Sequence, residues 1–475
     1  MTTGLERKPI QLRDLLLKSA FWVATFVTAL ALSGARAVAG SVGYVANIAD
    51  GTVSVINTST NSAVATISTN GAGAVAVTPD GTRAYVVTSG GVSVIDTATN
   101  TVVGSPIPIG ADTFGLFIGM AITPNGSRVY VANSGSGTVS VIATASNTVV
   151  ATIPVGTSPS GIAITPDGTH AYVVDSSPSS PSGTTSNVFV IDIATNTVVD
   201  TIPVGVLPIG IAITPDGTHA YVANTEDPSI SVVDIATNTV VDTIPLGVGP
   251  VGVAITPDGS QVYAVCVADP LAQTQTVLVI ATASNTVVSS IPVGLRAPNT
   301  AYLGLAVTPD GTGVYVANGG ANTLSVISTA SNTVTGSVTV GNGPVAVAFS
   351  PAILFSAFSA KLDISPDGFQ LKGTFALGAG GTINPPAQAL TLRIGTNTIT
   401  VPAGSFSSGP HGTFTFQGTI GGVALQIRLA PVGSGTYSIQ VDASGVNLTG
   451  PTNPVAVTLS IGNNTGTTSV TGQSN

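Results

Sequence analysis

The strongest constraint in this sequence is an internal repeat that fills residues 42–351. A tyrosine recurs at intervals of 41, 45, 42, 49, 42 and 52 residues, at Tyr44, Tyr85, Tyr130, Tyr172, Tyr221, Tyr263 and Tyr315. Each unit contains four short runs of apolar, mostly β-branched residues, which predict four strands, A to D in chain order. A period of about 40 to 45 residues with four strands is typical of β-propeller blades. The repeat therefore predicts an all-β, seven-bladed propeller.

The turns between the strands carry their own signals. Thr-Pro-Asp-Gly separates strands A and B in five units, and a sixth unit has Thr123-Pro-Asn-Gly126. Proline fixes φ, aspartate accepts a local hydrogen bond and glycine adopts a positive φ, so we expect the five aspartates to be structural. Between strands C and D, six units have Ala-Thr-Asn-Thr or Ala-Ser-Asn-Thr, which we also interpret as a turn.

The two ends of the repeat region are complementary. The first unit begins at its strand B, residues 44–47, and the last unit ends with a strand A, residues 345–349. Pairing of these segments would give every blade four strands and remove a free edge, which would otherwise invite aggregation. We therefore expect the ring to close through residues 345–349.

Four units contain Tyr-Val-Ala-Asn, starting at residues 44, 130, 221 and 315, followed by a strand similar to Val-Ser-Val-Ile. With the Thr-Pro-Asp-Gly turns, they resemble the YVTN β-propeller repeat of bacterial and archaeal surface and periplasmic proteins, although the third position is alanine. The resemblance covers residues 42–351 and implies the fold. It implies no single function, because the same repeat shape resembles non-catalytic surface modules and lactonase-like or redox propellers.

The amino-terminal residues have the order of a secretory signal peptide. Residues 19–35 carry no charge, follow four basic residues and lead into Ala35-Arg36-Ala37-Val38-Ala39. We predict that residues 1–39 are a signal peptide, with an uncleaved anchor as the alternative. The protein would then be periplasmic, on the cell surface or extracellular. Later apolar runs are too short to span a bilayer as a helix, so no transmembrane span is expected in the mature chain.

Charge and composition exclude several functions. Residues 1–37 hold five of the 12 basic and two of the 21 acidic residues, so their removal leaves a formal charge of −12. Such a surface repels phosphate backbones, and no nucleic-acid partner is expected. With three histidines, no Cys-x-x-Cys-His motif and a lone Cys266, the chain lacks the ligands of copper and haem redox sites. We expect no cofactor.

Beyond residue 351 the period is lost, but apolar and polar residues still alternate, as in residues 369–377 and 423–427. These short runs predict a small C-terminal β-sandwich-like domain in residues 352–475, after a propeller domain in residues 40–351. The polar closing stretch, residues 462–475, is expected to fray.

Four connections are longer than their counterparts: residues 110–119, 175–187, 266–276 and 294–304. All are D-to-A links or B-to-C loops, which share one face of an up-and-down propeller, and binding residues gather where loops vary. The predicted ligand contacts on this face are Asp112, Phe114, Phe117, Arg296 and Tyr302. They combine aromatic anchors with a polar rim. The alternative is that the aromatic side chains pack under their own loops.

Calcium is the one metal considered for this face. Its oxygen ligands would come from Asp112, Asp175 or Asp269, although no ligand-loop spacing is visible. His170 and His219 share one repeat position, just before the strand B tyrosine, and we interpret them as exposed turn residues.

These observations favour an exported, non-catalytic propeller scaffold that binds an envelope protein or a glycan. The alternative is a lactonase-like hydrolase, which needs acid, base and electrophilic groups that converge at the channel mouth. Arg296 near two carboxylates would favour the hydrolase, and an apolar, glycine-lined channel would favour the binding protein. No catalytic residue is predicted.

Overall fold

The computed structural model describes most of the chain beyond the amino-terminal segment. The described residues are 41–110, 119–177, 186–269, 274–295, 304–350, 353–354, 357–377, 383, 385, 390–394, 397–402, 404–433, 435–446, 448, 455–461, 464–470 and 473–474. Within these residues the regular elements are strands, apart from one 3-10 turn, η1 (Pro410–Gly412). The prediction of an all-β protein is confirmed.

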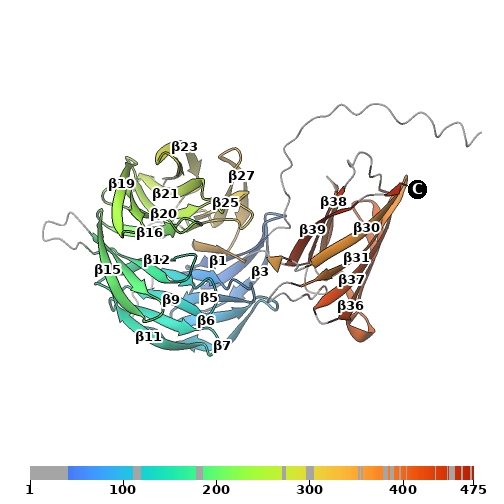
Figure 1. The fold of residues 1–475 in the computed structure, drawn as a ribbon, viewed down its shortest axis with the longest axis horizontal. Coiled ribbons are helices and arrows are strands. Elements are labelled where there is room, and N and C mark those ends of the chain that lie inside the picture. The colour runs from blue at the N-terminus through green and yellow to red at the C-terminus, as the bar shows by residue number, and fades with distance from the viewer. Residues whose placement is uncertain are drawn as a thin grey trace, which may run out of the picture. The chain divides into compact units, whose positions relative to one another are not determined.

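Residues 42–349 form seven four-stranded antiparallel sheets, which follow one another around a common centre in Figure 1. The first three sheets contain β1 (Val42–Asn47), β2 (Thr52–Asn57), β3 (Ser62–Ser68) and β28 (Pro344–Phe349); β4 (Val75–Val77), β5 (Arg83–Thr88), β6 (Gly91–Asp96) and β7 (Thr101–Ile107); and β8 (Met120–Ile122), β9 (Arg128–Asn133), β10 (Thr138–Ala143) and β11 (Thr148–Pro154).

The next two sheets contain β12 (Pro159–Ile164), β13 (His170–Asp175), β14 (Ser186–Asp192) and β15 (Thr197–Val204); and β16 (Pro208–Ile213), β17 (His219–Asn224), β18 (Ser229–Asp234) and β19 (Thr239–Pro245). The last two contain β20 (Gly249–Ile255), β21 (Gln261–Asp269), β22 (Thr274–Ala281) and β23 (Thr286–Val293); and β24 (Leu305–Val307), β25 (Gly313–Asn318), β26 (Thr323–Ser328) and β27 (Thr333–Thr339). This arrangement is that of a β-propeller.

The first sheet is completed by the last strand of the repeat. Strand β28 pairs antiparallel with β1, so that Ala348 lies opposite Tyr44 and Val347 opposite Val45. Phe349 also makes an edge-to-face contact with Tyr315 of the preceding sheet, with ring centroids 5.1 Å apart. The predicted closure through residues 345–349 is confirmed.

Burial differs between the two middle strands and the outer strand of a sheet. In β1 and β2 nearly every residue is buried, whereas β3 is mostly exposed. The middle strands are covered on both faces by neighbouring sheets, so both sets of alternating side chains are apolar or small. The outer strand is exposed along most of its length, and its exposed side chains include valines such as Val64 as well as serine and threonine.

Neighbouring sheets are joined by a hydrogen bond that repeats seven times. The strand B tyrosine of each sheet donates its hydroxyl proton to an asparagine Oδ1 in the C-to-D turn of the next sheet. The pairs are Tyr44–Asn100, Tyr85–Asn147, Tyr130–Asn196, Tyr172–Asn238, Tyr221–Asn285, Tyr263–Asn332 and Tyr315–Asn61. All seven asparagines have a positive φ, which asparagine tolerates better than most residues. The last pair links the seventh sheet to the first.

The Thr-Pro-Asp-Gly turns are held by the aspartates themselves. The Thr165 hydroxyl and the Thr169 amide donate to Oδ1 of Asp167 over 2.6 and 3.0 Å. These hydrogen bonds hold the pKa of Asp167 below its usual value. The expected structural role of this aspartate is confirmed, and Asp216 repeats it in the next sheet.

The C-terminal strands form two further sheets. The five-stranded sheet has the order β29 (Ile353–Leu354), β39 (Asn464–Val470), β38 (Val455–Ile461), β32 (Leu390–Ile394) and β33 (Asn397–Val401). The seven-stranded sheet has the order β34 (Ser407–Ser408), β35 (Phe414–Ile420), β36 (Val423–Gly433), β37 (Thr436–Ser444), β31 (Gly368–Ala376), β30 (Ala357–Ser365) and β40 (Gln473–Ser474). Both sheets contribute to one apolar core, with Leu392 and Leu459 from the first and Leu371 and Ile427 from the second.

The closing stretch differs from the sequence prediction. Residues 462–475 were expected to fray, but β39 pairs with β38 along seven residues and β40 pairs with β30. The backbone hydrogen bonds of a sheet do not depend on apolar side chains, so a Thr- and Gly-rich segment can form a strand when its neighbour supplies the core. Val470, which is buried, gives β39 a side chain in that core.

Candidate functional site

The strand ends place the B-to-C and D-to-A connections at one edge of each sheet. In the fourth sheet Pro159 lies opposite Asp175, Asp175 opposite Asn187, and Ser186 opposite Val204. We call the side of the propeller that bears these connections the loop face. The opposite side, which bears the A-to-B and C-to-D turns, is the turn face.

The predicted ligand contacts are not among the residues that the structure describes. Asp112, Phe114 and Phe117 fall within residues 111–118, and Arg296 and Tyr302 fall within residues 296–303. The two connections that contain them start and end on the loop face, after β7 and β23. Their role in binding stays a prediction.

Asp175, considered above as a calcium ligand, is used by the fold. Its side chain is buried, and its carboxylate accepts hydrogen bonds from the backbone amides of Thr157 and Ser158 over 3.2 and 2.8 Å. It thereby holds the D-to-A link that leads into β12. The side chain of Asp269 and all of Asp112 lie outside the described residues. Among the residues described, no three His, Cys, Asp or Glu side chains are grouped so that they could hold a metal ion.

Four buried asparagines brace the loop face at the position equivalent to Asp175. They are Asn47, Asn133, Asn224 and Asn318, the final residues of the four Tyr-Val-Ala-Asn segments. Each amide nitrogen donates to two hydroxyls on the adjacent strand, as Asn47 does to Thr52 and Ser54. The Ser54 hydroxyl in turn accepts a hydrogen bond from the amide of Gly341 in the D-to-A link. This role was not predicted from the sequence, although the recurrence of the asparagine indicates it.

The first strand of each sheet lines a central channel with a cavity of about 250 Å³. Its described lining is apolar or glycine, apart from one hydroxyl side chain, Ser160. That hydroxyl already lies within hydrogen-bonding distance of the Pro208 carbonyl oxygen and the Ser176 hydroxyl. Glycine is required here, because a Cβ at Gly161 or Gly304 would collide with a carbonyl oxygen of the next inner strand. The described part of the channel therefore presents no acid, base or cation.

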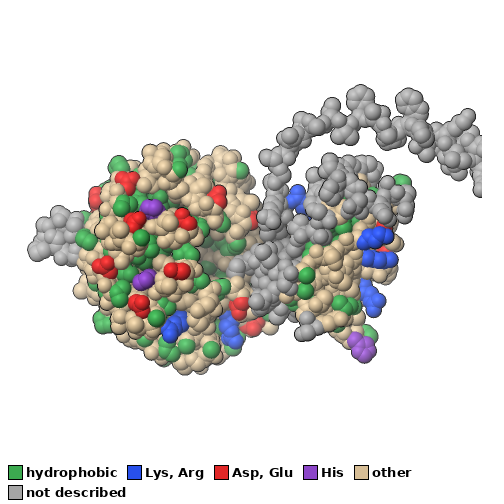
Figure 2. Space-filling model, viewed as in Figure 1, with side chains coloured by type: hydrophobic (Ala, Val, Ile, Leu, Met, Phe, Trp, Pro, Cys, Tyr) green, Lys and Arg blue, Asp and Glu red, His purple; other side chains and the backbone are tan. Residues whose placement is uncertain are grey.

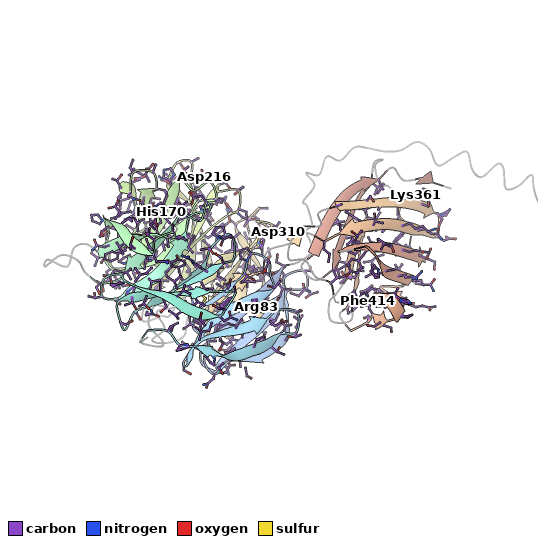
Figure 3. All side chains as sticks on the ribbon, turned by 60° about the horizontal axis from the view of Figure 1, so that its bottom comes forward. Arg83, His170, Asp216, Asp310, Lys361 and Phe414 are labelled. Atoms are coloured by element: carbon purple, nitrogen blue, oxygen red, sulfur yellow. The ribbon has the colours of Figure 1, made fainter. Side chains whose placement is uncertain are left out.

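Most of the described titratable side chains of the propeller lie on the turn face, although Asp50, Glu226 and Asp227 lie in B-to-C connections. Figure 2 shows acidic side chains distributed over the propeller, with two histidines among them. His170, Asp216 and Asp310, labelled in Figure 3, come from three different sheets and lie apart. The imidazoles of His170 and His219 each contact the threonine that precedes them, over 2.8 Å. We find no converging catalytic group among these residues.

Comparisons with known proteins bear on the fold. No family model and no curated protein matches the chain. Solved structures do match it, among them hydrazine synthase from Kuenenia stuttgartiensis, with 24% identity, a TM-score of 0.51 and coverage of 59% of this chain and 90% of that chain. A protein of unknown function from Desulfotomaculum acetoxidans has 22% identity and a TM-score of 0.54, with 66% and 99% covered.

A third similar structure comes from Bacteroides uniformis and is provisionally assigned as a 6-phosphogluconolactonase. It has 17% identity and a TM-score of 0.51, and the match covers 66% of this chain and all of that chain. At these identities the comparisons establish a propeller-type fold and nothing about activity. Among the residues that the structure describes, no helix is long and apolar enough to cross a bilayer.

Proposed function

We propose that this chain is an exported, non-catalytic propeller scaffold that binds an envelope protein or a glycan. In this proposal residues 1–39 are a signal peptide, residues 40–351 are a seven-bladed propeller of the YVTN-repeat type, and residues 352–475 are a β-sandwich-like accessory domain. The protein would act in the periplasm, at the cell surface or outside the cell.

The apolar channel is the observation that carries this proposal. Hydrolysis of a lactone needs groups that transfer protons and stabilise the developing oxyanion, all within reach of one carbonyl. The described channel lining supplies only aliphatic side chains, glycine and one hydroxyl that is already bonded. A rigid ring of sheets with variable connections on one face suits binding better.

We propose that the ligand contacts the loop face through Asp112, Phe114, Phe117, Arg296 and Tyr302. The buried Asn133 and Asn318 support this. They donate hydrogen bonds to the hydroxyls of Ser140 and Ser325, which also accept hydrogen bonds from the amides of Gly110 and Gly294, where the two long connections begin. Aromatic side chains beside a carboxylate and a guanidinium would then form an anchor with a polar rim.

Shortening residues 111–118 and 295–303 to the length of the other D-to-A links should abolish binding and leave the melting temperature nearly unchanged. The melting temperature should change little because the connections lie outside the strand ladders that stabilise the fold. Binding would be measured by pull-down from envelope extracts and on a glycan array. The control is Arg83→Gln, which changes a residue on the turn face, at the start of β5. A shortened protein that binds like its parent would show that the loop face is wrongly assigned.

The second candidate function is a lactonase-like hydrolase, because the structural relatives include a protein provisionally assigned as a 6-phosphogluconolactonase. It is tested by adding phosphorylated and unphosphorylated sugar lactones to the purified protein and following acid release. Turnover that is lost in Arg296→Gln would favour the hydrolase and overturn the scaffold proposal.

Export is expected to remove the amino-terminal segment. We expect the secreted protein to begin near Val38 or Gly40, because small residues precede both positions. Intact-protein mass spectrometry after expression with the native leader checks this. A secreted form that still carries residues 1–37 would support an anchor instead.

A further inference from the structure

The outer face of the seven-stranded sheet carries two parallel rows of polar side chains. In this sheet inward residues such as Leu371 and Ile427 are buried, so their neighbours along each strand point outward. Strand register aligns the first row as Lys361, Lys372, Gln440 and Arg428, on β30, β31, β37 and β36. It aligns the second row as Asp363, Gln370, Asp442, Gln426 and Gln417, the last on β35.

The first row concentrates positive charge in an acidic protein. Lys361 and Lys372 are the only lysines beyond residue 37, and with Arg428 they make up three of the seven basic residues there. Figure 2 shows Lys and Arg side chains close together on the C-terminal strands, and Lys361 is labelled in Figure 3. Lys361 has an ion pair with Asp363 at 3.5 Å, but its side chain is 64% exposed, so this pair holds it weakly. The cations are available to a ligand.

The second row lines a depression of about 520 Å³. Its walls include Gln370, Gln417, Gln426 and Asp442. Glutamine amides both donate and accept hydrogen bonds, and a carboxylate accepts them, so together these groups complement an array of hydroxyls. The Asp442 carboxylate accepts a hydrogen bond from Gln440 over 3.0 Å, which connects the two rows.

We propose that this face binds an acidic polysaccharide, such as a chain of uronic acids. Its hydroxyls would lie on the glutamine row and its carboxylates on the Lys361, Lys372 and Arg428 row. Side chains within a row are spaced by the distance between strands, about 4.8 Å, and the rows are separated by two residues, about 6.7 Å. These spacings match the dimensions of a sugar ring, so successive rings could follow the rows across the strands.

An anionic membrane is the competing occupant, and the surface suits it less. Membrane-binding surfaces combine cations with apolar or aromatic side chains that enter the interface. The two rows contain no such side chain, and a depression lined by amides does not fit a flat bilayer. The inference is independent of the loop-face proposal, because all its residues lie on the C-terminal strands.

The test is binding of polygalacturonate to the purified full chain by affinity electrophoresis and calorimetry. We expect binding that weakens with added salt, because the three cations are exposed to screening. The triple variant Lys361→Gln, Lys372→Gln and Arg428→Gln should bind polygalacturonate at least about tenfold more weakly than the parent, since it loses three charge-assisted hydrogen bonds. Arg83→Gln, which removes a cation from the propeller, should bind like the parent.

A second variant separates the roles of the rows. Gln370→Ala with Gln426→Ala should weaken polygalacturonate binding several-fold while its salt dependence stays that of the parent, because no charge is removed. Both variants should melt like the parent, since the changed side chains are exposed.

Four outcomes would overturn the inference. The first three are no binding of polygalacturonate, equal binding by the triple variant, and binding of phosphatidylglycerol vesicles in place of the polysaccharide. Proteins with shortened loop-face connections should still bind polygalacturonate. If they do not, the polysaccharide site belongs to the loop face, which would favour the proposed scaffold function and refute this site.

Discussion

Val345→Asp should destabilise the protein by about 3 to 5 kcal/mol, the cost of burying an unpaired carboxylate. Val345 lies on β28, is 3% exposed and packs in the core that contains Tyr44 and Val53 of the first sheet. Because β28 pairs the end of the repeat with its beginning, we also expect the ring to open there. The exposed edge of β1 should then produce oligomers.

Val64→Asp is the matched control, because it makes the same substitution in the same sheet. Val64 lies on the outer strand β3 and is 57% exposed, so its replacement should change stability by less than about 0.5 kcal/mol. Chemical denaturation and light scattering measure the two effects. Similar stability and a monomeric state for both variants would show that closure through β28 does not support the fold.

Alkaline solution should unfold the propeller between about pH 10 and pH 12. Burial raises the pKa of Tyr172, Tyr263 and Tyr315 to about 12, from the usual 10.0. A phenol that stays neutral in the folded protein but ionises in the unfolded chain stabilises the fold below pH 10 and loses this effect as the pH rises toward 12. Tyr44, Tyr85, Tyr130 and Tyr221 are shifted in the same direction. Together, the seven raised pKa values should make the free energy of unfolding fall steeply as the pH rises.

Melting curves and tyrosinate absorbance, recorded together against pH, check this expectation. The absorbance contributed by the seven repeat tyrosines should rise only as the fold is lost. Tyr172→Phe provides a comparison, because it removes the hydrogen bond to Asn238, at a cost of about 1 kcal/mol near neutral pH, and removes one ionising group. The variant should therefore lose stability less steeply above pH 10. Ionisation of the seven repeat tyrosines near pH 10 in a folded protein would contradict the role of these side chains.

Local chemistry accounts for the part of the fold that the sequence determined alone. Runs of β-branched residues, Thr-Pro-Asp-Gly turns and a seven-fold tyrosine specify strands, turns and repeats, because each depends on residues close together in the chain. The unmatched strands at the two ends of the repeat even predicted the pairing of β1 with β28. The polar strand β39 was missed, since its pairing depends on its neighbour rather than on its own side chains.

Tertiary structure decided which of the repeated residues meet. The tyrosine and the turn asparagine were both visible as repeats, but their hydrogen bond joins residues 56 to 254 positions apart and exists only because adjacent sheets face each other. The row of Lys361, Lys372 and Arg428 likewise arises from strand register, which places residues distant in the chain side by side. Periodicity assigns a residue to a strand and a face, and only the pairing of strands and the closure of the ring determine what lies next to it.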